Sequence, residues 1–254
     1  MKNKNELFPV NKQHYNNFYG EGEGIFQYME KSGGNRWFCA LLSDLVKKID
    51  KNEIHSIVDL GCGVGVKSAL MAKLFPRAKV TGTDFAEPAI KKANEYWKYE
   101  NLSFSTDDVT KDDSNKYDIV CMFEVLEHIE DWKKMLDKIM AMSNQYIILS
   151  FPTGRMRPYE KYIGHYRNFV RGEVESYIVK NNFDLFERYN AGFPLWSPIL
   201  RDITNFFYKG YAEITYHKMS KVAYIGHCLC YFLLRYFTVK KIGDQCLLLF
   251  KRQS

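Results

Sequence analysis

Short apolar segments alternate with helical segments along most of the 254-residue chain, and this alternation constrains the fold more than any other feature. Seven segments have the length and composition of strands: residues 54–60, 78–83, 101–106, 117–123, 145–151, 182–192 and 244–252. Helical or short connectors separate the first five, which predicts a parallel sheet with helices on both faces. The central strands are continuously apolar, as strands covered on both faces must be. We therefore expect one α/β domain of the doubly wound, Rossmann-like kind.

Three segments lie outside this alternation and are expected to border the ligands. Residues 1–50 precede the first strand and are expected to form helices that act as a lid. The insertions 152–170 and 193–241 follow strands of the core, residues 54–151. Because ligands of such sheets bind at the carboxyl ends of the strands, we expect both insertions to face the substrate.

Composition narrows the classes of partner. The net charge is +6, but the basic residues occur mainly as scattered pairs, so stable nucleic-acid binding is not expected. The six cysteines form no CxxC pair, which favours reduced thiols and a cytoplasmic location. The longest apolar stretch, residues 222–237, is too short to span a bilayer. We interpret it as a buried or lid helix, with peripheral membrane contact as the alternative; nothing predicts the oligomeric state.

The sequence VDLGCGVG, residues 58–65, ends the first strand and opens the first helix of the core. Its glycines allow a sharp turn and a close approach of the backbone to a ligand. Asp84 ends the second strand, where a carboxylate can accept both hydroxyls of a ribose. Val66 stands where the dinucleotide fingerprint needs a glycine, which argues against a nicotinamide-dependent oxidoreductase.

Four motifs in order, VDLGCGVG, TGTDFAEPAI, STDDV and YDIVCMFEVLEHI, resemble the class I S-adenosylmethionine-dependent methyltransferases over about residues 54–152. The resemblance implies a seven-stranded sheet whose last strand is antiparallel, with S-adenosylmethionine as cofactor. It also implies that Asp84 binds the ribose, that Asp108 (or Asp107) binds the adenine, and that Glu124 borders the methionine end. Tyr15 and Tyr19 are candidates to cover the cofactor. The expected cofactor-binding residues are Asp59, Gly61, Cys62, Gly63, Gly65, Asp84, Phe85, Asp108, Val109, Phe123, Glu124 and Tyr19.

The stretch FEVLEHIE, residues 123–130, places two carboxylates and an imidazole on one face if a helix starts near Glu124. One interpretation is a local cluster favoured by the helix dipole. A second makes His128 a general base. A third is a magnesium or manganese site formed by Glu124, Glu127, His128 and the downstream His165. ExxEH with a later His is similar to the small-RNA 3′-end and ubiquinone-type O-methyltransferases; the catalytic candidates are His128, His165 and Glu124.

The loop after the fifth strand is basic and aromatic, and it is expected to hold the methyl acceptor. Its candidate substrate residues are Arg155, Arg157, Tyr159, Tyr166 and Arg167. The arginines could bind a phosphate or carboxylate, or they could pair with nearby glutamates. We expect O-methylation of a small anionic or amphiphilic acceptor, such as a glycan or lipid-linked intermediate, a quinone precursor or a secondary metabolite. N- or C-methylation, a nicotinamide-dependent oxidoreductase and a non-catalytic binding module are the alternatives.

Overall fold

A computed structural model of the chain describes residues 12–20, 24–108, 115–211 and 218–253. One sheet of seven strands has the order β3-β2-β1-β4-β5-β7-β6. The strands are β1 (Ser56–Leu60), β2 (Lys79–Asp84), β3 (Leu102–Thr106), β4 (Tyr117–Phe123), β5 (Ser143–Pro152), β6 (Phe183–Ala191) and β7 (Gln245–Arg252). β7 pairs antiparallel with both β5 and β6, and the other pairings are parallel. The expected fold and the antiparallel last strand are confirmed.

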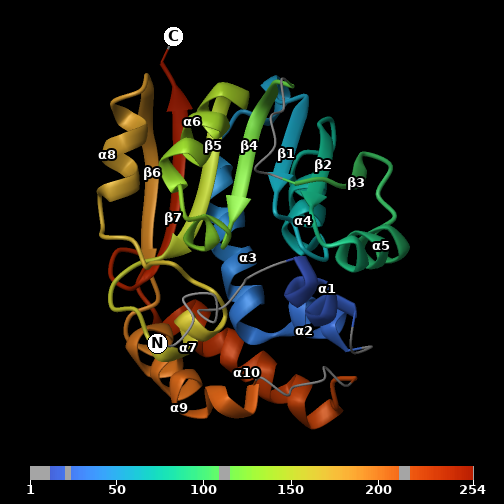
Figure 1. Cartoon of the computed structure of the whole chain (residues 1–254), viewed down its shortest axis with the longest axis vertical. Helices are drawn as coiled ribbons and strands as arrows, with labels where there is room; N and C mark the ends of the chain where they lie inside the picture. The colour runs from blue at the N-terminus through green and yellow to red at the C-terminus, as the bar shows by residue number, and fades with distance from the viewer. Residues whose placement is uncertain (1–11, 21–23, 109–114, 212–217, 254) are drawn as a thin grey trace, which may run out of the picture.

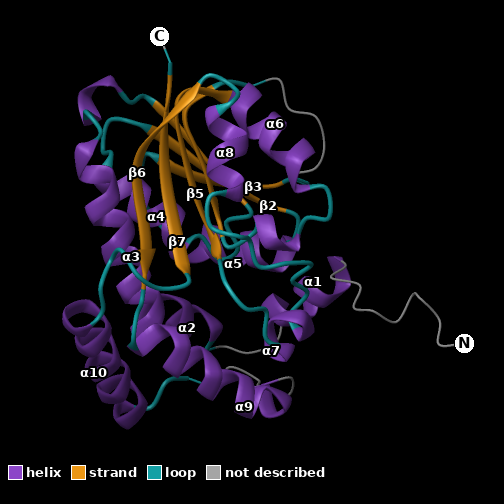
Figure 2. Ribbon diagram, turned by 90° about the vertical axis from the view of Figure 1, so that its left-hand side faces the viewer, coloured by secondary structure: helices purple, strands orange, loops and turns teal. Residues whose placement is uncertain are grey.

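Helices cover both faces of this sheet (Figures 1 and 2). The helices are α1 (Lys12–Gly20), α2 (Ile25–Lys31), α3 (Gly33–Leu45), α4 (Val66–Leu74), α5 (Glu87–Tyr96), α6 (Trp132–Met142), α7 (Pro158–Tyr162), α8 (Glu173–Val179), α9 (Arg201–Tyr211) and α10 (Lys221–Phe237). Helices α6 and α8 lie on one face, and α3 and α4 lie on the other (Figure 1). This arrangement is the doubly wound layering that the alternation of elements predicts.

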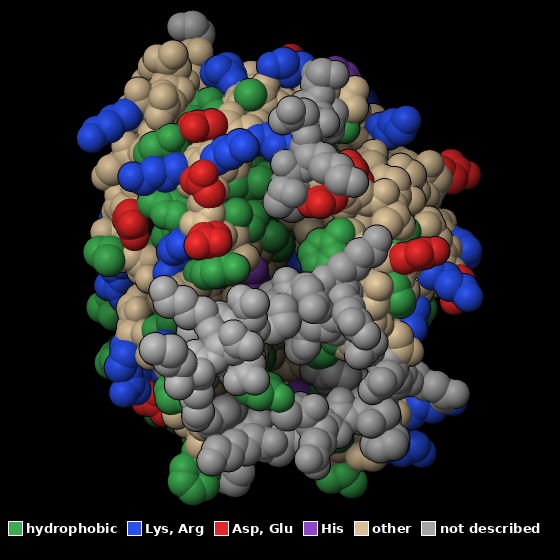
Figure 3. Space-filling view, in the orientation of Figure 1, with side chains coloured by type: hydrophobic (Ala, Val, Ile, Leu, Met, Phe, Trp, Pro, Cys, Tyr) green, Lys and Arg blue, Asp and Glu red, His purple; other side chains and the backbone are tan. Residues whose placement is uncertain are grey.

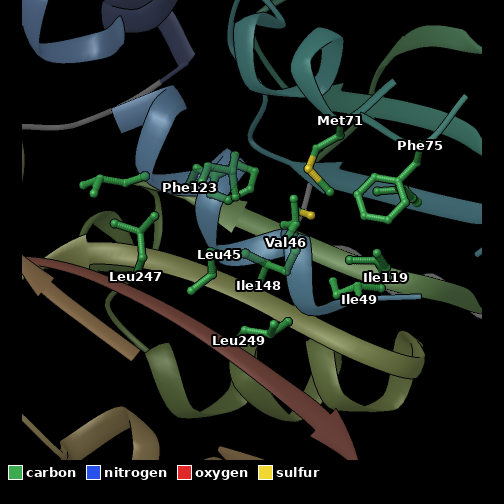
Figure 4. Close-up of a cluster of buried hydrophobic side chains, with 14 of the residues drawn as sticks. Leu45, Val46, Ile49, Met71, Phe75, Ile119, Phe123, Ile148, Leu247 and Leu249 are labelled. Carbon is green, nitrogen blue, oxygen red and sulfur yellow. The ribbon is translucent and has the colours of Figure 1, made fainter. Parts of the chain in front are cut away.

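The alternation of side chains along β4 builds two cores. Ile119, Cys121 and Phe123 are buried against α3 and α4 (Figure 4). Val120 and Met122 point to the opposite face, where they are buried against α6. Successive side chains of a strand face opposite sides of the sheet, so a strand between two helical layers must be apolar throughout.

The remaining helices gather beyond the carboxyl ends of the parallel strands. α1, α2, α7, α9 and α10 lie at this end of the molecule in Figure 1. Two of them lie in the expected insertion 193–241, and α7 lies in the insertion 152–170. On the face shown in Figure 3, Lys and Arg side chains are interspersed with Asp and Glu over the described residues. The insertions are therefore helical, and they lie at the edge of the sheet where ligands bind.

α10 is attached to the body of the protein through α3. Leu234 is buried, and the guanidinium of Arg235 lies 2.6 Å from a carboxylate oxygen of Asp44. Residues 222–237 are thus a surface helix in which Leu234 is the buried residue. The alternative of a buried helix is wrong, and the alternative of a lid helix stays a prediction. None of the described helices is long and apolar enough to cross a membrane. All six cysteines lie in the described residues, where they form no disulfide.

One expected helix is replaced by a turn. After β4 the chain forms the 3₁₀ turn η4 (Leu126–His128), and α6 begins only at Trp132. Glu124 has a φ of 58°, a left-handed conformation that no α-helical residue adopts. The prediction of a helix starting near Glu124 is therefore wrong. Glu127 and His128 lie in this turn rather than on the face of an α-helix.

Candidate active site

The glycine loop between β1 and α4 is fixed by the neighbouring strand. The N–H groups of Gly61 and Cys62 both donate to the carbonyl oxygen of Thr83, at 2.8 and 2.9 Å. The Asp84 carboxylate accepts a hydrogen bond from the Gly63 N–H at 2.8 Å and another from the Ala86 N–H at 2.8 Å. β2 therefore braces the loop through both its backbone and its terminal carboxylate.

Two glycines of this loop leave no room for a side chain. At Gly61, with a φ of 76°, a Cβ atom would lie 2.6 Å from Val125. At Gly63, with a φ of 54°, a Cβ atom would lie 2.7 Å from the Tyr19 hydroxyl. Only glycine combines this backbone conformation with such a close approach. The loop thus needs glycine both for its own turn and for the elements packed on it.

A cavity of about 730 Å³ opens over the loop at the carboxyl ends of β1, β2 and β4. Of the expected cofactor-binding residues, those lining it are Tyr19, Asp59, Gly61, Cys62, Gly63, Asp84, Phe85, Asp108, Phe123 and Glu124. Asp107 also lines it, so both candidates for the adenine contact are present. Gly65 instead faces the ring of Phe104, and Val109 lies outside the described residues. The volume of the cavity suits a small-molecule cofactor.

Burial perturbs the carboxylates under this cavity. Asp59 is buried and accepts a 2.6 Å hydrogen bond from Ser68 Oγ, while its Oδ1 has no hydrogen-bond partner. Burial raises the pKa of Asp59 to about 6. Burial also raises the pKa of Asp84, although its two backbone donors act in the opposite direction. Both carboxyls are therefore poised to favour a positively charged ligand, because a nearby cation stabilises their ionised form.

Glu124 is held at the floor of the site by the sheet. Its Oε1 accepts hydrogen bonds from Ser150 Oγ at 2.7 Å and from Gln245 Nε2 at 2.8 Å. These donors belong to β5 and β7, so the carboxylate is fixed by two strands that follow it in sequence. Its Oε1 is thus held by the sheet.

Glu127, His128 and His165 form a separate cluster of possible ligands, in which one donor atom of each lies within 4.8 Å of the others. Glu127 is buried, and its Oε2 has no hydrogen-bond partner. His165 Nε2 lies 4.0 Å from Glu127 Oε1, and the two imidazole rings are 4.6 Å apart between centroids. Of the four expected metal ligands, three meet, while Glu124 is engaged elsewhere.

The charge states in this cluster follow from burial. Burial and the nearby Glu124 carboxylate raise the pKa of Glu127 well above its usual range. Burial lowers the pKa of His165 to about 4, so its imidazole is neutral at pH 7. Tyr15 Oη lies 3.4 Å from His128 Nδ1, and burial raises the pKa of that tyrosine, so its phenol stays protonated. The cluster therefore holds imidazole and carboxylate groups with few protein donors to stabilise a charge.

A second cavity, of about 230 Å³, lies on the other side of this cluster. Its polar wall includes Glu127, His165 and Arg201, and its apolar wall includes Trp196 and Leu200. Glu124 and His128 line this cavity and the larger one as well. Two compartments thus meet at the stretch FEVLEHIE.

Comparisons with known proteins identify the fold and its motifs. Residues 58–145 match the family model described as a methyltransferase domain. Malonyl-[acyl-carrier protein] O-methyltransferase of Bacillus cytotoxicus is 30% identical over 141 residues, covering 54% of this chain and 48% of that protein. Residues 58–145 thus carry a methyltransferase domain, and the matches support a class I S-adenosylmethionine-dependent methyltransferase. It spans about half the length of the curated relatives that it matches.

Two further methyltransferases support this placement. The mitochondrial ubiquinone biosynthesis O-methyltransferase of Dictyostelium discoideum is 27% identical over 186 residues, covering 58% of this chain and 57% of that protein. A magnesium protoporphyrin IX methyltransferase of Synechocystis, solved with bound S-adenosylhomocysteine, has a TM-score of 0.57 at 19% identity. That superposition covers 95% of this chain and 94% of the other, and at this identity it shows the shared fold alone.

Most of the expected substrate residues of this methyltransferase are engaged with protein atoms. Arg155 Nη2 and Arg157 Nε both bind Asp202 Oδ1, at 2.9 and 2.5 Å. Arg167 donates to the carbonyl oxygens of Ile129 and Glu130. Tyr166 is exposed, and only Tyr159 of the five lines the smaller cavity. Their role in substrate binding stays a prediction.

Three cavity residues escaped the sequence analysis. Arg201 lines the smaller cavity, where its Nε donates to Glu160 Oε1 at 3.0 Å and its Nη1 to the Thr153 carbonyl at 3.2 Å. Gln245 reaches the site from β7. Lys67 lines the larger cavity from the first turn of α4. Only Lys67 carried a local signal, since it directly follows the glycine loop; the other two depend on tertiary structure.

Proposed function

We propose that this chain transfers the methyl group of S-adenosylmethionine to an oxygen atom of a small amphiphilic acceptor. The observation that carries the proposal is the pair of cavities that share Glu124 and His128. In this arrangement the larger cavity holds the donor and the smaller one holds the acceptor. The methyl group then has to cross only the boundary between them.

The reaction is a displacement at the methyl carbon by the acceptor oxygen, with the thioether as leaving group. The protein contributes chiefly by positioning the two reactants in line and by excluding water. Asp84 and the glycine loop fix the donor, while the cover formed by Tyr15 and Tyr19 closes the larger cavity. The acceptor must lose a proton, so a group at the boundary has to favour the oxyanion.

Glu127, His128 and His165 suit a divalent cation such as Mg²⁺ or Mn²⁺ at that boundary. The buried Oε2 of Glu127 lacks a hydrogen-bond partner, and a carboxylate with two imidazoles can hold a divalent ion. Mn²⁺ matches this donor set better than Mg²⁺, because Mg²⁺ prefers oxygen ligands. When bound, the ion would lower the pKa of the acceptor hydroxyl. His128 is the protein's own candidate proton acceptor, and it is the general base if activity proves independent of metal.

The walls of the smaller cavity favour an acceptor with a polar head and an apolar portion. Trp196, Leu200 and Ile163 supply apolar surface in a cavity that carboxylates and imidazoles also line. Arg201 is already paired with Glu160 and Asp244, so an anionic group on the acceptor gains little there. Methylation at oxygen is supported by the names of the two curated relatives described above, both of which are O-methyltransferases. A phenol or an enol-type hydroxyl on a hydrophobic skeleton fits these walls.

The test is a donor-consumption assay on fractionated cell metabolites, run with and without a chelator. We expect E127Q and H165Q to lower turnover at least 100-fold while S-adenosylhomocysteine still binds, because both residues lie outside the donor cavity. Glu173→Gln is the matched control, since Glu173 is exposed on α8. Mass spectrometry of the product assigns the methylated atom.

Each outcome separates one alternative. Turnover that persists after chelation but is lost in H128Q would favour the general base over the metal. A methylated nitrogen or carbon would contradict the assignment to oxygen. Binding of a nicotinamide dinucleotide without binding of S-adenosylhomocysteine would overturn the proposal as a whole.

A further inference from the structure

The solvent face of α10 is apolar, the reverse of an ordinary surface helix. Five large side chains on it are each at least half exposed: Val222, Ile225, Leu229, Phe232 and Tyr236. They recur every three or four residues, so they form one stripe along the helix. The opposite face packs on α3 through Leu234 and the Arg235–Asp44 ion pair. The exposed stripe is therefore a fixed feature of a docked helix.

The apolar surface extends beyond this stripe. On α10 itself, Tyr224, Leu233 and Phe237 are also exposed. Ile203 and Phe206 of α9 are 49% and 80% exposed, and α9 lies at the same end of the molecule as α10 (Figures 1 and 2). Hydrophobic side chains also reach the surface at the lower rim of Figure 3. The stripe on α10, with these further exposed side chains at the same end of the molecule, marks an interaction site rather than scattered surface residues.

The segment that carries α10 has charged residues of one sign, although Arg235 and Lys240 pair with Asp44 of α3. Residues 214–243 contain five Lys or Arg and no Asp or Glu. Lys221 opens α10 and Lys241 follows it, and both side chains are exposed. A basic rim with aromatic and aliphatic side chains between its ends is the composition of helices that lie in the interface of a bilayer.

We propose that the exposed face of α10, together with that of α9, docks on the surface of an anionic lipid bilayer. α10 has 17 residues, and no described helix could cross a membrane, so the helix would lie in the plane of the interface. A second copy of the chain is a poorer occupant. A two-fold interface would bring the same lysines together without any acidic residue of this segment to pair with them.

Docking at this face would place the acceptor cavity near the lipid. Trp196, Leu200, Arg201 and Thr204, which line the smaller cavity, belong to α9 and to the π-helical turn η5 (Leu195–Leu200) that precedes it. An amphiphilic acceptor dissolved in the same bilayer could then enter from that side. This extension rests on the proposed function, whereas the docking itself does not.

Vesicle co-flotation of the full chain tests the docking directly. We expect flotation with vesicles of mixed phosphatidylcholine and phosphatidylglycerol, and much less with phosphatidylcholine alone. I225E/F232E should bind the mixed vesicles at least about tenfold more weakly, because two charged side chains replace apolar ones that would insert into the bilayer. V170E/V179E is the matched control, because both valines are exposed near α8, far from α10 in sequence. K221E/K241E should weaken binding to the mixed vesicles, because these are anionic, and should leave binding to pure phosphatidylcholine vesicles unchanged.

Thermal unfolding and S-adenosylhomocysteine binding show whether each variant is folded and has an intact donor site. Equal flotation of the wild type and I225E/F232E would overturn the proposal. So would a wild-type dimer in light scattering that becomes a monomer in I225E/F232E without any lipid binding, since the second copy would then be the occupant. Failure of the wild type to bind S-adenosylhomocysteine would instead contradict the proposed function. The result on membrane docking would not be affected.

Discussion

Asp84 illustrates how one side chain links two elements of the donor site. Its carboxylate accepts from Gly63 in the loop and from Ala86 at the start of α5. We expect Asp84→Ala to weaken S-adenosylhomocysteine binding by about 10- to 100-fold, because hydrogen bonds to a charged group contribute roughly 1.5–3 kcal/mol. Titration calorimetry measures the change. Asp184→Ala, at an exposed position on β6, should leave affinity unaltered, and equal affinity in both variants would contradict this role.

The raised pKa of Asp59 predicts that the stability of the native state depends on pH. Its folded pKa is about 6, above the ordinary value of an aspartate, so folding favours the protonated form. The native state therefore loses stability as the pH rises from about 4 to about 6, and the full penalty remains above that range. In the cofactor-free protein, the free energy of unfolding of Asp59→Asn relative to the wild type should rise by up to about 3 kcal/mol as the pH increases from about 4 to about 6. Urea unfolding at pH 4 and pH 7 measures this difference, which should vanish if Asp59 is ionised at low pH.

Sequence analysis located residues whose role is set by local backbone, and it missed those set by tertiary contacts. The loop glycines and Asp84 follow from their place between a strand and a helix, and Gly61, Gly63 and Asp84 line the larger cavity. Arg155 and Arg201 are both arginines in inserted segments, and no pattern distinguishes them. Only the folded structure shows that Arg155 pairs with Asp202 and that Arg201 lines the smaller cavity.

At the scale of elements, replacing three glycines by alanine distinguishes the cost of a strained backbone from the cost of steric overlap. Gly226 lies within α10 with open space around it, so Gly226→Ala should stabilise the protein by about 0.5–1 kcal/mol. Gly172 has a φ of 88° and open space, so its replacement by Ala should cost about 1 kcal/mol. Gly65 has a φ of 78°, and a Cβ there would lie 2.4 Å from Phe104, so Gly65→Ala should cost more than either. Denaturant unfolding ranks the three, and any other order would contradict the geometry.

The elements themselves were largely predictable because apolar periodicity reports burial. The seven strands were expected near their observed positions, since the central strands are buried on both faces and read as continuous apolar runs. The helix expected at Glu124 failed because the sheet imposes a different local conformation. The carboxylate of Glu124 bonds to β5 and β7, and the backbone adopts a positive φ there. Such long-range pairing has no signature in the residues around position 124.

At the scale of the whole molecule, donor binding should stabilise the native state. A ligand present at about 100 times its dissociation constant adds roughly 2.7 kcal/mol, which for a chain of this size raises Tm by about 5–10 °C. We expect S-adenosylhomocysteine to produce this shift in differential scanning fluorimetry. A nicotinamide dinucleotide at the same concentration is the control and should produce none, since Val66 replaces the glycine of its fingerprint. The reverse result would contradict the donor assignment.

The arrangement of the inserted helices lay beyond sequence analysis. Residues 193–241 were expected to be ordered near the substrate, and they do form α9 and α10 beyond the sheet (Figure 1). Their docking depends on individual pairs such as Arg235 with Asp44, residues 191 positions apart. The apolar stripe on α10 has the same periodicity whether it faces a core, a lid or solvent. Periodicity alone could not decide among these.

The hydrogen bond between Gln245 and Glu124 also determines when the site can form during synthesis of the chain. The glutamate is synthesised 121 positions before the glutamine that holds it, and β7 must insert between β5 and β6 to bring the two together. A nascent chain released before this strand leaves the ribosome would keep its glycine loop but lack the clamp on Glu124. Truncated products should therefore retain the donor motifs yet remain catalytically silent.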